Sequence, residues 1–101
     1  MKILLVYPPV DLELNIKTFI YAYDRSHPLG LAYIASVLEG SGHEVRIIDA
    51  KAEALTVEQV LEKVVDFNPQ VVGLSFSTLD FCISKLLAQK IKSQGNYTIL
   101  I

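Results

Sequence analysis

The sequence predicts an α/β domain of three layers, in which helices cover both faces of a parallel sheet. Aliphatic runs without polar alternation, at residues 3–7 and 71–75, are typical of strands buried on both faces. Segments with helical apolar spacing separate the runs, so that strands and helices alternate along the chain. Because nearly all connections are short, we expect right-handed crossovers between parallel strands.

The first helix is predicted over residues 29–38. Pro28 suits its first turn, and Gly40 or Gly42 can end it. Five apolar side chains recur at helical spacing and predict its buried stripe: Leu29, Tyr33, Ile34, Val37 and Leu38. Residues 44–49 then form a short second strand.

The second half of the chain repeats this alternation. Thr56 and Gln59 form a capping-box pattern that opens a second helix, which Pro69 ends. Its predicted stripe is Val57, Val60, Leu61, Val64 and Val65. After the strand at residues 71–75, a third helix has cap candidates in residues 77–80 and the stripe Leu79, Cys82, Ile83, Leu86, Leu87 and Ile91. Residues 97–101 form a fourth strand. Its exposed edge offers a site for pairing with a second copy of the chain, although the sequence does not determine the oligomeric state.

Composition narrows the function classes. The chain has 101 residues, a net charge of -2 and 51% hydrophobic residues. Because the basic residues are scattered, we expect no binding to nucleic acid or to a membrane surface. The apolar run near the start is too short to span a bilayer and leaves no room for a signal peptide. The single Cys82 excludes an internal disulfide. A cytoplasmic location is therefore expected.

One connection is exceptionally long. Residues 10–27 form a strand-to-helix connection about three times longer than the usual upper limit. Its aromatic content at residues 19–23 argues against disorder. We interpret it as a flap that covers a ligand or docks on a neighbouring domain. The alternative is a loop that only packs on the sheet edge.

The expected ligand edge follows from the strand order 2-1-3-4, the flavodoxin-like (Rossmann-like) arrangement. Such sheets bind ligands where strands one and three diverge. A dinucleotide site or P-loop needs glycines after strand one, and Tyr7, Pro8 and Pro9 stand there instead. The edge also lacks the phosphate loop of a flavin mononucleotide site and the clustered carboxylates of a phospho-accepting receiver. Its prolines, small residues and hydroxyls suit a large, mostly neutral ligand.

Three segments carry a family resemblance: YPP at residues 7–9, PLGLAYIASVLEGSGHEVRIID at residues 28–49, and PQVVGLSFST at residues 69–78. The chain resembles the N-terminal cobalamin-binding domain of cobalamin-dependent radical S-adenosylmethionine enzymes. The resemblance implies that residues 1–101 form one cobalamin-binding domain, truncated before the usual last strand, at the N-terminus of a longer enzyme. A downstream radical domain, with a 4Fe-4S cluster and S-adenosylmethionine, would perform the chemistry as a methyltransferase or related enzyme.

The resemblance also implies which residues bind the cofactor. Ser75 and Ser77 match the serine-rich strand end that bonds to the nucleotide tail, although either can instead cap the following helix. Gly30 and two alanines keep the first helix thin beside a slot for the tail, expected between the first and third helices; ordinary close packing is the alternative. The predicted cofactor-binding residues are Pro8, Pro9, His27, Pro28, Leu29, Gly30, Asp49, Ser75, Phe76, Ser77 and Thr78.

His27 departs from the motif of methionine synthase and the mutases. In D-x-H-x-x-G the aspartate orients the histidine beneath cobalt, but Asp24 lies one residue too far from His27. We therefore assign no metal ligand and expect His27 to contact the corrin or solvent. No catalytic residue is predicted, because the chain has no paired catalytic groups and no cysteine cluster.

Two other functions stay open. One is a degenerate domain that has lost the cofactor and acts as a packing or substrate-gating partner of the radical domain. The other is an unrelated flavodoxin-like domain that binds a small molecule.

Overall fold

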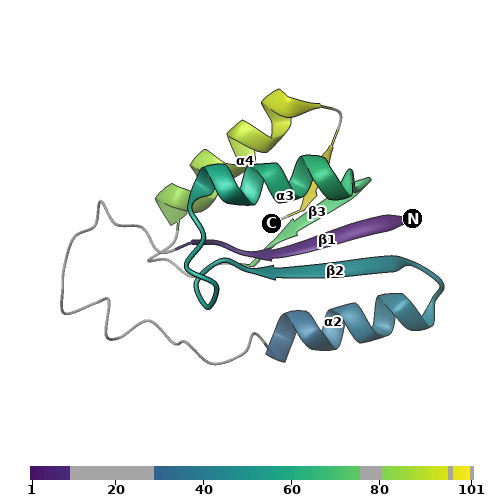
Figure 1. Ribbon diagram of the computed structural model, residues 1–101. Helices are drawn as coiled ribbons and strands as arrows, with labels where there is room; N and C mark the ends of the chain where they lie inside the picture. Colours follow the sequence, from purple (N-terminus) through teal and green to yellow (C-terminus); the bar gives the residue numbers. More distant parts are fainter. Residues whose placement is uncertain (10–28, 76–80, 96, 101) are drawn as a thin grey trace.

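The computed structural model describes residues 1–9, 29–75, 81–95 and 97–100, and within them the predicted sheet is confirmed (Figure 1). All three pairings are parallel, and the strand order is β2-β1-β3-β4. The strands are β1 (Lys2–Tyr7), β2 (Glu44–Asp49), β3 (Val71–Leu74) and β4 (Thr98–Leu100). The fold class predicted from the sequence is therefore correct.

Three helices make the outer layers. Helix α2 (Leu29–Gly40) lies on one face of the sheet, whereas α3 (Val57–Phe67) and α4 (Phe81–Gln94) lie on the other (Figure 1). The core is divided accordingly, because successive residues of β1 point to opposite faces. Ile3 and Leu5 pack against α2, and Leu4 and Val6 pack in the larger cluster beneath α3 and α4.

The ends of two helices follow the local sequence. The Thr56 side chain accepts a hydrogen bond from the Gln59 backbone N–H at 3.2 Å, and the Gln59 side chain accepts one from the Thr56 N–H at 2.8 Å. The predicted capping box is thus confirmed. Asn68 ends α3 in the left-handed conformation, with φ of 50°. Gly42 has φ of 92° in the turn after α2, which makes it, rather than Gly40, the glycine that the turn requires.

The predicted buried stripe of α2 is wrong except at Leu38. Leu31 and Ala35 are buried against the sheet, and Leu38 is half-buried. Tyr33 and Val37, two members of the predicted stripe, are 79% and 61% exposed. Helix α2 has a single charged residue and apolar residues on every side, so its sequence does not determine which side is buried.

The stripes of the other two helices are correct in part. In α3, Val60 and Val64 are buried as predicted, but Phe67 replaces Val65, which is exposed. In α4, Leu87 and Ile91 are buried as predicted, together with Ser84, whereas Cys82 and Leu86 are exposed. The cap candidates in residues 77–80 lie outside the described residues.

Candidate functional site

The C-terminal ends of β1, β2 and β3 form one rim. Tyr7 pairs with Asp49 and Val6 with Leu74 in the parallel register. The backbone N–H of Ser75 donates to Val6 O at 3.0 Å and continues this ladder past the end of β3. Pro8 follows β1 and is buried. Helix α2 begins at the same end of the sheet (Figure 1), so the predicted edge exists in the structure.

The structure brings together six of the predicted site residues at or beside this rim: Pro8, Pro9, Leu29, Gly30, Asp49 and Ser75. Five others lie outside the described residues: His27, Pro28, Phe76, Ser77 and Thr78. The long connection at residues 10–27 lies outside them as well, so our interpretation of it as a flap stays a prediction.

Asp49 has a local structural role. Its carboxylate oxygen Oδ1 accepts a hydrogen bond from the backbone N–H of Ala52 at 3.1 Å. The backbone N–H of Glu53 donates to Asp49 O, and the N–H of Ala50 donates to Tyr7 O, both at 3.0 Å. These bonds stabilise the turn after β2, as aspartates commonly do in turns.

The face of the sheet that carries α2 is covered unevenly. Helix α2 packs over β1 and β2. On β3, by contrast, Gly73 and Ser75 face the same side and are only half-buried, while Val72 and Leu74 on the other side are buried. Thr98, on the same side of β4, is exposed. The described residues therefore leave the β3 and β4 half of this face partly open.

One flank of α2 borders this opening. With 100° per residue, Gly30, Ile34 and Val37 lie on one flank of the buried stripe, and Ala32 and Ser36 lie on the other. A right-handed crossover from β1 to β2 turns the first flank toward β3. A side chain at Gly30 would have no atom within 4 Å of its Cβ. We call the partly uncovered surface bordered by Gly30, Ile34, Gly73 and Ser75 the α2–β3 corner.

The predicted slot between the first and third helices is wrong. These helices are α2 and α4, and the sheet lies between them (Figure 1). The flank of α2 that carries Gly30 faces β3 instead. Gly30 is exposed on this flank, whereas Ala35 is buried against β1 and Ala32 lies on the far flank.

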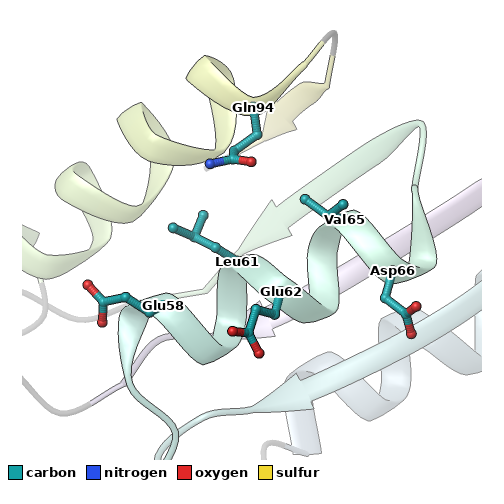
Figure 2. A pocket seen from close by; sticks show the side chains of 6 residues that line it. All are labelled: Glu58, Leu61, Glu62, Val65, Asp66 and Gln94. Atoms are coloured by element: carbon teal, nitrogen blue, oxygen red, sulfur yellow. The ribbon is translucent and has the colours of Figure 1, made fainter.

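A cavity of about 450 Å³ lies elsewhere, between α3 and α4. Figure 2 shows Leu61 and Val65 directed from α3 toward α4, and Gln94 directed from α4 toward α3. The remaining lining residues are Glu58, Glu62 and Asp66. The cavity is open to solvent and rimmed by carboxylates, which would repel an anionic group. We therefore place the candidate site at the rim and not in this cavity.

Two features of the rim were missed in the sequence. Gly73 is one, although a glycine inside a strand often marks a close approach. The other is Lys51, the residue after the buried Ala50, whose Nζ lies 4.4 Å from the ring centroid of Tyr7. In the sequence, a basic residue directly after a strand is only weak evidence for a binding site, because the fold decides which aromatic ring it contacts.

Two further features are absent from the described ranges. Nowhere in them do three or more His, Cys, Asp or Glu side chains gather in a way that could hold a metal ion. Within the same ranges, each helix is too short or too polar to cross a lipid bilayer.

Comparison with known proteins identifies the family. The family model of the B12 binding domain matches residues 18–101. An uncharacterized methyltransferase of Pyrococcus horikoshii, PH0819, is 42% identical over an alignment that covers 77% of this chain. Cytidylyl-2-hydroxyethylphosphonate methyltransferase of Streptomyces wedmorensis is 33% identical, with 63% of this chain covered. The alignments span only 16% of the length of each relative. No solved structure matches at a comparable level of significance. The chain belongs to the B12-binding domain family.

Proposed function

We propose that this chain is the cobalamin-binding module of a radical S-adenosylmethionine methyltransferase or a related enzyme. The observation that carries the proposal is the α2–β3 corner, which opens at the rim where parallel sheets bind ligands. In this proposal the corner receives the nucleotide tail of cobalamin, and the corrin ring lies over the strand ends. Bound cobalamin would supply the methyl-transfer chemistry.

The residues of the corner fit this ligand. Gly30 and Gly73 have no side chains, and Ser75 provides a half-buried hydroxyl at the end of β3. A flat aromatic base needs such a narrow, uncharged space, and a few hydrogen bonds suffice to orient it. Pro8 and Pro9, which are buried directly after β1, add no charge to the rim. The assignments of His27, Pro28, Phe76, Ser77 and Thr78 remain part of the proposal.

The rest of the enzyme is inferred from the relatives. Both relatives are named methyltransferases, and this chain spans about 16% of their length. We therefore infer a longer cytoplasmic polypeptide in which a downstream radical domain holds the 4Fe-4S cluster and S-adenosylmethionine. The described part of this chain has no group placed to hold a metal cluster, so the chemistry is assigned to that domain.

A binding titration tests the proposal. Hydroxocobalamin added to the purified protein should shift its visible absorption bands as the lower base leaves cobalt and enters the corner. Gly30→Leu should weaken binding at least about tenfold, because the new side chain would occupy the corner. The variant should fold normally, since a Cβ at Gly30 meets no atom and leucine is a better helix former than glycine.

Ala32→Leu is the matched control. Ala32 is exposed on the opposite flank of α2, so the same bulk should leave binding unchanged. Equal weakening by both substitutions would place the ligand away from the corner. A spectrum identical to that of free hydroxocobalamin, in the unsubstituted protein, would refute cobalamin binding and favour the degenerate, cofactor-free domain.

A further inference from the structure

The rim has a positive charge at the end of β1. The Lys51 ammonium lies over the ring of Tyr7, with Nζ 4.4 Å from the ring centroid, and both residues are half-buried. A cation at this distance is attracted to the face of the ring. The flexible lysine stem is therefore directed from β2 across to the end of β1.

The backbone that carries Lys51 is also well fixed. The N–H of Ala50 donates to Tyr7 O at 3.0 Å, and the N–H of Leu55 donates to Ala50 O at 2.9 Å. On the other side of Lys51, the N–H of Ala52 donates to Asp49 Oδ1 at 3.1 Å. The ammonium thus starts from a backbone held to the end of β1, which reduces the entropy lost when it binds a ligand.

A second group of cation–ring contacts, on Phe67, has a structural role and serves as a comparison for the contact between Lys51 and Tyr7. Lys2 and Arg46 lie over the ring of Phe67, at 5.2 Å and 4.5 Å from its centroid. Phe67 is buried at the end of α3, far from the C-terminal strand ends. There the cations cover a core residue. Lys51, in contrast, stands at the rim where the ligand is expected.

We propose that Lys51, held over Tyr7, binds the phosphodiester of the cobalamin nucleotide loop. The inference rests on the proposed function. The amide side chains of cobalamin are neutral, and its nucleotide phosphodiester is the group with a negative charge. Lysine is a common partner of phosphate because its ammonium donates charge-assisted hydrogen bonds. In a domain of net charge -2, Lys51 is the basic residue among the described strand ends, Tyr7–Pro9, Asp49–Lys51 and Leu74–Ser75.

The test compares two ligands that differ in the proposed contact. Hydroxocobalamin carries the phosphodiester, whereas dicyanocobinamide lacks the phosphate, the ribose and the lower base. Dissociation constants are measured by absorption titration for the unsubstituted protein and for Lys51→Met. Methionine keeps an apolar stem over Tyr7, and equal thermal unfolding midpoints would show that the fold is retained.

We expect Lys51→Met to weaken hydroxocobalamin binding about tenfold and to leave dicyanocobinamide binding unchanged. Lys51→Arg should keep most of the affinity, because it keeps the charge. Lys63→Met, at an exposed position on α3, removes the same charge and should change neither constant. The advantage of the unsubstituted protein over Lys51→Met should also shrink at high salt.

Two results would overturn the inference while leaving the proposed function intact. In one, Lys51→Met weakens both ligands equally, which would make Lys51 a contact of the corrin or a support of the fold. In the other, Lys51→Met weakens neither. If the unsubstituted protein binds neither ligand, the proposed function itself fails. Each measurement is an equilibrium constant and needs no activity from the rest of the enzyme.

Discussion

At the scale of single residues, Gly73 shows how tightly the sheet and α2 are packed. It pairs with Leu5 in the parallel register of β1 and β3. A Cβ at position 73 would lie 2.9 Å from Leu5 Cδ2, closer than carbon atoms normally approach. Leu5 is buried against Leu31 and Ala35 of α2, so its side chain has little room to move. Gly73 therefore gives the Leu5 side chain room beside β3.

Gly73→Ala should lower the free energy of unfolding by about 1 kcal/mol, because the new methyl group forces Leu5 to shift. Urea denaturation measures this change. Gly40→Ala is the control, since a Cβ at position 40 meets nothing within 4 Å and stability should hold or rise slightly. Adding Leu5→Val to Gly73→Ala should cost less than the sum of the two single changes. Strict additivity would mean that the two side chains do not meet.

Lys51 illustrates the same dependence on tertiary neighbours. The sequence places it one residue after the buried Ala50, and only the pairing of β1 with β2 brings its ammonium to the Tyr7 ring. Asp49, in contrast, was predicted to bind the cofactor and uses one carboxylate oxygen to hold the Ala52 N–H. For Asp49, the cofactor role stays a proposal alongside this observed structural one.

At the scale of elements, α2 is the least determined by its own sequence. Its apolar residues surround the helix. The side that packs on the sheet is Leu31, Ala35 and Leu38, and it shares only Leu38 with the stripe that helical spacing predicted. Helix α3 behaves differently, because three of its charged residues mark the outer side and the capping box fixes its start. Its buried residues were accordingly predicted more accurately.

Matched alanine substitutions in α2 should separate the two sides. Leu31→Ala removes a side chain that is 6% exposed and should lower the free energy of unfolding by about 2 to 5 kcal/mol. Val37→Ala removes one that is 61% exposed and should change stability by less than about 0.5 kcal/mol. Chemical denaturation of both variants is the measurement. The reverse order of effects would restore the stripe predicted from the sequence.

At the scale of the whole molecule, the strand order determines which helices share a face. The connection from β1 to β2 crosses the sheet in one direction, whereas the connections from β2 to β3 and from β3 to β4 cross it in the opposite direction. With right-handed crossovers, this reversal puts α2 opposite α3 and α4. The predicted order 2-1-3-4 already contained this result, and the slot between the first and third helices contradicted it. The α2–β3 corner follows from the same reversal.

The two edges of the sheet differ in charge. Edge strand β2 carries Glu44, Arg46 and Asp49, whereas β4 (Thr98–Leu100) has no charged residue. Uncharged edges recruit further strands. We therefore expect weak, concentration-dependent self-association of this chain through β4, measured by sedimentation velocity. Thr98→Lys, at an exposed position of β4, should reduce it. A monomer at all concentrations, or equal association of the variant, would contradict pairing through this edge.

The sequence by itself determined the order of strands and helices, the capping box of α3, the strand order and the rim that carries Pro8, Pro9 and Ser75. These features depend on local sequence patterns and on the general rule that crossovers between parallel strands are right-handed. The tertiary structure decided which side of α2 is buried, that the open space lies beside β3, and that Lys51 meets Tyr7. Each of these depends on contacts between residues that are distant in sequence. Because α2 has apolar residues on all sides, its own sequence does not show which side packs against the sheet.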